Sequence, residues 1–181
     1  MPNYRRYHGI SNCYFFTVVT HQRQMILTDE LFRNTLRKAI LKVRAQYPFK
    51  IDAWVLLPDH LHCIWTLPAN DINSSVRWNW IKNFVSRHIA NEYQRVDLLS
   101  DSRRHRGEST LWQRRFWEHA ILSEADYFAH MEYVHINPLK HGLVAQVKDW
   151  PYSTFHRLVR EGVYPPDWAG SGDDVLFYFD K

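Results

Sequence analysis

His60 and His62 stand one residue apart in the segment LPDHLHCIW, directly after a Pro-Asp turn signal. In a β-strand, alternate side chains point to the same face, so the two imidazoles would converge while Leu61 and Cys63 would point the other way. Two imidazoles at this spacing could hold a divalent ion, but catalysis by an ion needs further ligands and an open position. The same residues could also be two polar side chains in an ordinary strand, and the spacing alone does not decide between these interpretations.

A second group of polar side chains shares one face of a predicted helix in ADYFAHMEYVHINP, residues 125–138. Asp126, His130, Tyr133 and Asn137 fall on this face, and Phe128, Met131 and His135 are expected on the opposite face. Tyrosine can act as a covalent nucleophile, and a nearby cation would help a neutral phenol to react. Asparagine can give an oxygen to a metal. Alternatively, Tyr133 and Asn137 are ordinary helix-surface residues, with Asn137 closing the helix before Pro138.

The distribution of charged residues is a third feature that could serve a function. The chain has 23 Lys and Arg against 19 Asp and Glu, and its basic residues occur in groups separated by aromatic residues. These groups contain Arg5, Arg6, Lys82, Arg87, Arg103, Arg104, Arg106, Arg114 and Arg115. Because cations neutralise phosphates and ring faces stack on exposed bases, the pattern favours DNA binding by these residues. A solvated charged surface over an aromatic core would give the same composition.

Seven segments have the periodicity of strands or helices and must position these side chains. Strands are expected at 12–20, 51–57, 60–67 and 111–122, and helices at 29–45, 73–94 and from Ser123 to near Asn137, where Pro138 ends the last one. The order strand, helix, strand, strand, helix, strand predicts the split βαβ arrangement of a ferredoxin-like α+β fold. Its antiparallel sheet would carry helices on one face, and the last helix, which bears Tyr133, and an aromatic tail would be additions to it.

The length of 181 residues and the absence of a second pattern predict one domain over residues 1–181. Residues 97–110 are polar and basic without periodicity, so we expect a basic loop there, and a C-terminal tail at about 148–181. The buried stripe of the second helix is expected to contain Trp80, Ile81, Phe84, Val85 and Ile89. No apolar run of about 18 residues occurs and the start lacks the apolar middle of a signal peptide, so we expect a cytoplasmic protein without a membrane span.

Three motifs together resemble the REP-associated tyrosine transposases, a bacterial branch of the single-tyrosine HUH nucleases: LPDHLHCIW, EYVHINPLKHGLV and WPYSTFHR. The resemblance covers nearly the whole chain. It implies that His60 and His62 bind a catalytic Mg²⁺ or Mn²⁺ ion, with Leu61 as the hydrophobic centre of the motif, and that Tyr133 is the nucleophile. Related transposases carry a glutamine one helical turn after the tyrosine as the third metal ligand, and Asn137 stands at that place here.

The resemblance also implies a function. The protein would bind single-stranded DNA that contains a REP hairpin, cleave it to leave a 5′-phosphotyrosine and a free 3′-OH, and rejoin strands without a nucleotide cofactor. It would act as a monomer or homodimer in the bacterial cytoplasm, associated with the nucleoid. His119 and His130 are expected beside the site, where they would support it rather than bind the catalytic ion. An alternative is a domesticated regulator that binds the hairpin without turnover, but the presence of His60, His62 and Tyr133 favours the enzyme.

Overall fold

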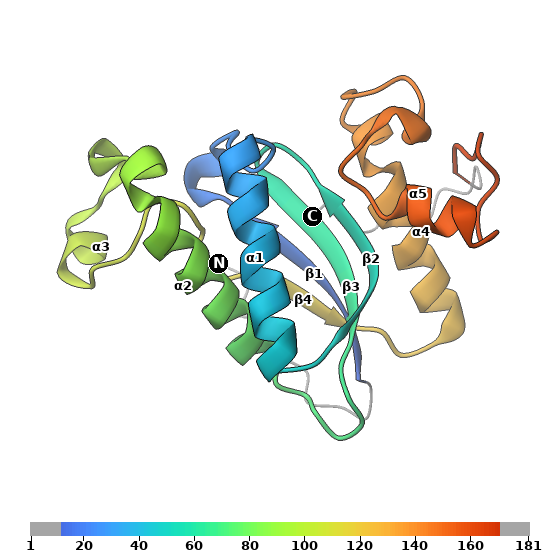
Figure 1. Ribbon diagram of the computed structural model, residues 1–181, viewed down its shortest axis with the longest axis horizontal. Coiled ribbons are helices and arrows are strands. Elements are labelled where there is room, and N and C mark those ends of the chain that lie inside the picture. The colour runs from blue at the N-terminus through green and yellow to red at the C-terminus, as the bar shows by residue number, and fades with distance from the viewer. Residues whose placement is uncertain (1–11, 171–181) are drawn as a thin grey trace.

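A four-stranded antiparallel sheet lies at the centre of the fold, with the strand order β2-β3-β1-β4 (Figure 1). This computed structural model describes residues 12–170 of the chain. The strands are β1 (Cys13–Val19), β2 (Lys50–Leu56), β3 (His60–Thr66) and β4 (Trp117–Ala120). Because β3 pairs with both β1 and β2, the HLHC segment lies inside the sheet rather than at its edge.

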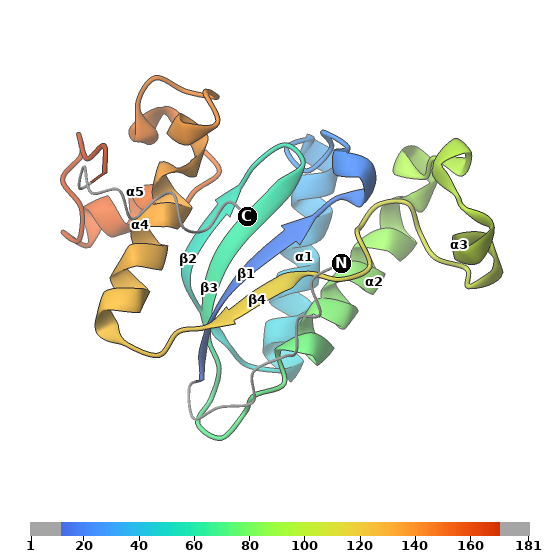
Figure 2. The ribbon, with the colours of Figure 1, turned by 180° about the vertical axis from the view of Figure 1, so that it is seen from behind.

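Helices cover both faces of this sheet. They are α1 (Glu30–Gln46), α2 (Ser74–Tyr93), α3 (Asp101–His105), α4 (Glu124–Lys140) and α5 (Phe155–Arg160), with the short 3-10 helices η1 (His21–Arg23), η2 (Val96–Leu98) and η3 (Val147–Asp149). In Figure 1, α1 and α2 lie in front of the sheet, and in Figure 2 the sheet lies in front of them. Among residues 12–170, no helix is long and apolar enough to cross a membrane. The arrangement confirms the predicted ferredoxin-like α+β fold with an additional C-terminal helix.

Alternation of side chains along β3 divides the apolar core in two. Leu61 and Trp65 point toward α1 and α2 and belong to the larger apolar cluster. Ile64 points to the other face, where it packs in a second cluster with Phe15 of β1 and Val134 of α4. The even-numbered side chains of β3 therefore face α4, because successive residues of a strand alternate between faces.

The buried side of α2 differs from the predicted stripe. Trp80 is 50% exposed and Phe84 is half-buried, whereas Trp78 is fully buried. The Trp78 indole stacks on Trp65 of β3, with ring centroids 4.3 Å apart and planes at 15°. This aromatic contact rotates the helix so that Trp78 rather than Trp80 faces the sheet, and the predicted position of Trp80 is wrong.

Arg77 anchors the start of α2 to the connection between α1 and β2. Its side chain is 1% exposed, forms an ion pair with Asp71 at 2.7 Å and donates hydrogen bonds to the backbone oxygens of Tyr47 and Pro48. We expect Arg77→Ala to lower the free energy of unfolding by about 2 kcal/mol, less than for a fully buried ion pair, because Asp71 is partly solvated. Urea denaturation measures the loss, with Arg87→Ala on the exposed side of α2 as the control. A loss below about 0.5 kcal/mol would contradict the anchoring role.

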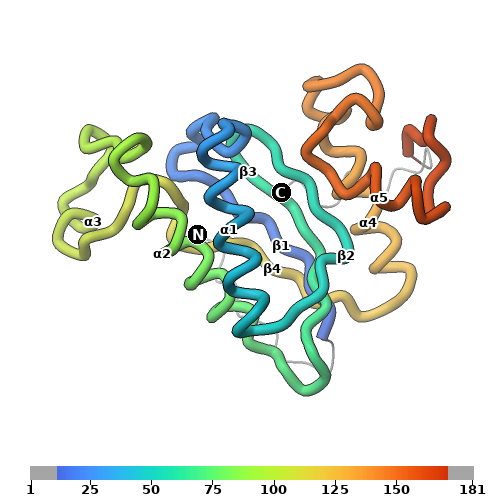
Figure 3. Tube along the Cα trace, viewed as in Figure 1, coloured from blue at the N-terminus to red at the C-terminus, as the bar shows by residue number. Residues whose placement is uncertain are grey.

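The segment 97–110, predicted as a basic loop, contains the end of η2 and helix α3. Ser100 caps α3, since its Oγ accepts a hydrogen bond from the N–H of Arg103 at 3.3 Å. Thr110 fixes the far end of the segment, because its N–H donates to the side chain of Gln94 at 3.0 Å. Polar caps rather than an apolar stripe hold this short helix, which is why periodicity did not predict it. Figure 3 shows α3 on the side of the molecule opposite to α4.

Strand β4 is shorter than the predicted segment 111–122. Trp112 forms only an isolated bridge to the residue after β1, and regular pairing begins at Trp117. Between these two positions the chain leaves the sheet, and the Nζ atom of Lys82 on α2 donates to the backbone oxygens of Gln113 and Arg114 at 2.6 and 3.1 Å. The lysine therefore holds this connection against α2 instead of letting it extend the strand.

Helix α4 continues beyond the end predicted at Asn137 and reaches Lys140, with Pro138 inside its last turn. A proline near the end of a helix removes one backbone donor without stopping the helix at once. The chain turns at Gly142, whose φ is 66°, and two N–H groups donate back to the oxygens of Leu139 and Pro138 at 2.9 Å. This Schellman arrangement, rather than the proline, ends the helix.

The chain after α4 packs over this helix and returns to the outer side of β2. His135 on α4 is buried, and its Nε2 lies 2.9 Å from the Oγ1 of Thr154. The N–H of Leu56 donates to the oxygen of Tyr152, and the N–H of Thr154 donates to the oxygen of Trp54, both at 2.9 Å. Strand β2 therefore has backbone hydrogen bonds on both of its sides.

Candidate active site

His60 and His62 lie next to each other on the side of β3 that faces α4. Their ring centroids are 4.8 Å apart, and both side chains are buried. Leu61 and Cys63 belong to the opposite apolar cluster, which contains residues of α1 and α2. The predicted division of these four side chains between the two faces is confirmed, and the two imidazoles meet at the interface between sheet and helix.

An oxygen atom lies against the Nδ1 atom of each imidazole. His60 Nδ1 lies 2.6 Å from Oδ1 of Asp59, and His62 Nδ1 lies 2.8 Å from Oγ1 of Thr17. When the Nδ1 atom carries the proton of the neutral ring, the Nε2 atom keeps a lone pair. Histidines that bind metals are typically oriented in this way by a hydrogen bond from the other ring nitrogen.

Asp59 is itself held by Arg23, whose Nη1 lies 2.9 Å from Oδ2. Burial favours the neutral form of Asp59, but hydrogen bonds from His60 and Arg23 outweigh burial and hold the pKa of the carboxyl well below its usual value. Asp59 is therefore ionised at neutral pH and accepts the Nδ1 proton of His60, which fixes the lone pair of that ring on Nε2.

Burial lowers the pKa of His62 well below its usual value, and the ammonium of Lys140, together with the imidazoles of His60 and His141 when protonated, acts in the same direction. His62 is therefore neutral at neutral pH. Its Nε2 atom is buried and has no hydrogen-bond partner among residues 12–170. A neutral imidazole with an available Nε2 is the form in which histidine binds a divalent cation.

Helix α4 brings Tyr133 to the histidines. The tyrosine ring stands edge-on to His62 at a centroid distance of 5.1 Å and to Phe15 at 5.8 Å. Lys140, seven residues later on the same helix, places its Nζ atom 5.3 Å from the centre of the Tyr133 ring. This cation–π contact puts a positive charge beside the tyrosine ring. The cation expected to help a phenol to react is thus present on the same helix.

Asn137 follows Tyr133 by one helical turn and is fully buried. Its Nδ2 donates to the backbone oxygen of Tyr133 at 2.8 Å, which fixes the orientation of the carboxamide. Its Oδ1 is buried and has no hydrogen-bond partner within the described part of the chain. Because a buried acceptor without a donor costs about 1 to 3 kcal/mol, the two acceptors at this interface, His62 Nε2 and Asn137 Oδ1, fit a bound cation.

The other tyrosine of α4, Tyr127 in its first turn, has different surroundings. Burial raises the pKa of Tyr127 to about 12, and negative charge on Asp52 and Cys13 adds to the effect. Cys13 begins β1, whereas the partner of His62 in the sheet is Thr17, four residues further along that strand. Tyr127 is therefore displaced along the sheet from the histidines and harder to ionise than an ordinary tyrosine.

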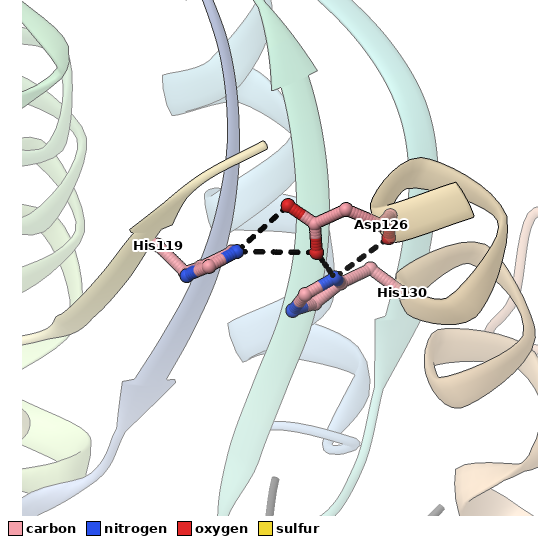
Figure 4. Close-up of side chains that lie close together, drawn as sticks. All are labelled: His119, Asp126 and His130. Atoms are coloured by element: carbon pink, nitrogen blue, oxygen red, sulfur yellow. Dashed lines mark hydrogen bonds and ion pairs between the residues drawn. The ribbon is translucent and has the colours of Figure 1, made fainter. Parts of the chain in front are cut away.

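His119 and His130, predicted to support the site, form a cluster of their own around Asp126 (Figure 4). The Asp126 carboxylate lies 3.0 Å from His119 Nε2 and 2.9 Å from His130 Nδ1. The ring of Phe15 contacts both His130, at a centroid distance of 4.8 Å, and His62, at 5.5 Å. The cluster thus adjoins the predicted metal ligands through this phenyl ring.

A groove of about 760 Å³ lies between α2 and the segment that contains α3. Five predicted DNA-binding residues line it: Lys82, Arg87, Arg103, Arg106 and Arg114. The carboxylate of Glu108 lies within 3.8, 3.1 and 2.9 Å of the last three, in that order. One carboxylate among three guanidinium groups leaves a net positive charge, which suits a phosphate backbone.

Lys82 and the predicted DNA-binding residues outside the groove have different surroundings. Burial lowers the pKa of Lys82 to about 8, and its ammonium group is committed to the two backbone oxygens described above. Arg104 and Arg115 are exposed. Arg5 and Arg6 lie outside the described residues.

Three contributors to the site were not predicted. Thr17 faces His62 in the register of β1 with β3, which the sequence alone does not give. Lys140 stands seven residues after Tyr133, so the helical period contained the signal. Asp59 directly precedes His60 in the motif, and its carboxylate was a visible candidate for orienting the first imidazole.

Comparisons with known proteins agree with these features. The family model described as "Transposase IS200 like" matches residues 10–137. A REP-associated tyrosine transposase of Escherichia coli K12 is 46% identical over 175 residues, which cover 96% of this chain and 94% of the relative. A Haemophilus influenzae Rd protein provisionally given the same name is 42% identical over 174 residues, 96% of each chain. A solved structure of a REP-associated tyrosine transposase bound to a REP hairpin is similar with a TM-score of 0.78 and 46% identity, over 96% of this chain and 94% of that one.

Proposed function

This chain belongs to the REP-associated tyrosine transposases of the IS200-like family, and we propose that it binds a REP-type DNA hairpin and cleaves and rejoins the adjoining single strand. The observation that carries this proposal is the buried Nε2 of His62 beside the ring of Tyr133, together with the buried Oδ1 of Asn137 one helical turn after that tyrosine; neither atom has a hydrogen-bond partner within residues 12–170. Such a substrate would keep the protein with the bacterial chromosome. The hairpin bound by the related solved structure supports the choice of substrate.

His60, His62 and Asn137 would hold one divalent ion, Mg²⁺ or Mn²⁺. When bound, the ion would supply positive charge that neutralises a scissile phosphate. The protein contributes orientation: Asp59 and Thr17 fix the imidazoles at Nδ1, and the backbone of α4 fixes the carboxamide.

Tyr133 would attack the phosphorus of the scissile phosphodiester. A bond forms between the phenolic oxygen and phosphorus, the bond from phosphorus to the 3′-oxygen breaks, and the phenolic proton is transferred in net terms to that 3′-oxygen. The products are a 5′-phosphotyrosine and a free 3′-OH. Attack by another 3′-OH reverses these changes and releases the tyrosine, so strand transfer conserves phosphodiester bonds and consumes no nucleotide. The charge of Lys140 beside the ring would stabilise the phenolate during both steps.

The first experiment compares a single-stranded and a double-stranded form of the substrate. We expect a single-stranded oligonucleotide with a REP hairpin and an unpaired flank to form a covalent adduct with the protein in Mn²⁺, visible as a band of lower mobility on a denaturing gel. The same flank in a perfect duplex should give at least about tenfold less adduct, because stacked and paired DNA presents its phosphate to the buried tyrosine poorly. Equal amounts of adduct from both would contradict the proposed substrate. A hairpin that binds tightly but gives no adduct in Mn²⁺ or Mg²⁺ would favour the regulator without turnover.

A second experiment tests the groove as the hairpin-binding surface. Arg106→Ala should weaken hairpin binding severalfold at 0.1 M salt and reduce the slope of log affinity against log salt by about one, because one phosphate contact is lost. Lys38→Ala, an exposed lysine on α1, is the matched control and should leave the slope unchanged. Equal slopes for both variants in a fluorescence-anisotropy titration would exclude Arg106 from the phosphate contacts.

A further inference from the structure

A cluster of three side chains with ligand atoms lies beside the candidate active site, where β4 meets the first turns of α4 (Figure 4). His119 comes from β4, and Asp126 and His130 lie four residues apart on α4. One ligand atom from each residue lies within 4.8 Å of the other two. His119 Nε2 is 3.0 and 3.2 Å from the two carboxylate oxygens of Asp126, and His130 Nδ1 is 2.9 Å from Oδ1.

We propose that His119, Asp126 and His130 form a second metal site, which takes a divalent transition metal such as Zn²⁺ and is separate from the catalytic ion. Two imidazoles and one carboxylate form a ligand set that Zn²⁺ prefers, whereas Mg²⁺ prefers oxygen ligands. Ligand atoms about 2.1 Å from a tetrahedral Zn²⁺ ion are about 3.4 Å from one another. The hydrogen-bonded separations in this cluster are slightly shorter, so a bound ion requires an expansion of a few tenths of an ångström.

Binding of the ion by the two imidazoles needs no co-reactant to balance the protons. In the hydrogen-bonded cluster, His119 Nε2 and His130 Nδ1 are the ring atoms that face the carboxylate. A neutral imidazole has one proton and can carry it on either nitrogen. Before an ion binds, the nitrogens that face Asp126 carry the protons, and His130 Nδ1 also lies 2.9 Å from the backbone oxygen of Asp126. Binding therefore requires each ring to change tautomer: the proton leaves the nitrogen that faces the ion for solvent, the other ring nitrogen takes up a proton from solvent, and the freed nitrogen supplies a lone pair. Burial also lowers the pKa of His130, which favours its neutral form.

The cluster is open to solvent on one side and closed by rings on the other. The side chains of His119 and Asp126 are 34% and 22% exposed, which leaves room for an ion to enter and for water as a further ligand. His130 is completely buried; its ring stacks on His119 at 4.7 Å and is covered by Phe15 at 4.8 Å. Because Phe15 also contacts His62, an apolar ring separates the two sets of ligands.

A bound ion would join β4 to α4, the helix that carries Tyr133 and Asn137. Hydrogen bonds between His119 and Asp126 already make this connection. Coordination would strengthen it, because an ion that binds only the folded state adds its binding free energy to stability. The site is thus a structural clamp on the nucleophile's helix rather than part of the reacting centre.

The test uses the full chain with His60→Ala and His62→Ala together, so that the catalytic ligands are absent. Equilibrium dialysis should show one Zn²⁺ per chain, Co²⁺ should give visible absorption bands of a low-coordinate site, and Zn²⁺ should raise the melting temperature. Adding His119→Ala should remove all three signals. Adding His88→Ala, an exposed histidine of α2, should leave them unchanged.

Absence of bound Zn²⁺ in the double variant, or retention of the ion after His119→Ala, would overturn the proposal. Asp126→Asn is a less suitable variant, since this carboxylate also accepts the N–H of Leu122 at 3.0 Å and its loss could disturb the start of α4. His119→Ala replaces a partly exposed side chain at the end of a strand and decides the question. No DNA enters these measurements, so their failure would leave the proposed cleavage by Tyr133 untouched.

Discussion

Tyr133→Phe is expected to reduce the covalent protein–DNA adduct by at least about a thousandfold, because no other group replaces a nucleophilic hydroxyl at this position. The substitution removes one oxygen and keeps the ring that packs edge-on to His62 and Phe15. Hairpin affinity should therefore stay within about twofold of the unmodified protein, and the free energy of unfolding within about 1 kcal/mol. Denaturing gels in Mn²⁺ measure the adduct, and anisotropy titrations measure the affinity.

Tyr127→Phe is the matched control on the same helix. Its hydroxyl belongs to a tyrosine whose pKa burial raises to about 12, and six residues at 100° each place it about 120° away from Tyr133 around the helix. This variant should retain the adduct. Peptide mapping of the trapped complex gives an independent result, and a DNA-linked peptide that contains Tyr127 but not Tyr133 would contradict the assignment.

His62→Ala should reduce the rate of adduct formation by about a hundredfold or more, and millimolar Mn²⁺ should not restore it, because one of the two proposed imidazole ligands of the ion is gone. Hairpin binding should survive, since His62 does not line the basic groove, which is formed by α2 and the segment that contains α3. Figure 3 shows α3 on the side of the molecule opposite to α4. Thr17→Val is expected to give a smaller loss, about tenfold, because it removes only the oxygen that lies 2.8 Å from His62 Nδ1.

His88→Ala is the control for the loss of an imidazole elsewhere on the chain, and its adduct rate should be unchanged. Full activity of His62→Ala in the presence of EDTA would show that the phosphate is neutralised by protein side chains alone. In that case the buried acceptors His62 Nε2 and Asn137 Oδ1 would require another explanation.

The parts of the site that depend on the alternation of side chains along a strand, or on the repeat of a helix, could be predicted from the sequence. Alternation along a strand puts His60 and His62 on one face, and the helical period puts Tyr133 and Asn137 on another. That these two faces meet depends on where α4 packs on the sheet, and the family motifs rather than the periods indicated it. The partner of His62, Thr17, depends on the register between β1 and β3, which no local pattern contains.

Two of the predictions were wrong because the local sequence is compatible with two different structures. Trp78 and Trp80 are both apolar and two residues apart, so the sequence did not decide which would enter the core, and the stack on Trp65 decided it. At Pro138, the disfavoured backbone geometry predicted an earlier helix end, but the turn at Gly142 closes the helix further on. In both cases the deciding contact comes from residues outside the periodic segment itself: Trp65 lies in β3, and Gly142 follows the last turn of α4.

The backbone hydrogen bonds between β2 and residues 152–154 have a consequence for solubility. An outer strand with free N–H and C=O groups is a template on which another chain can add a strand, and such edges promote aggregation. Here the chain covers its own outer strand with a segment about 100 residues later in the sequence. During synthesis on the ribosome, β2 therefore remains an open edge until nearly the whole protein has emerged. A chain interrupted before residue 150 would keep that edge and would be prone to self-association.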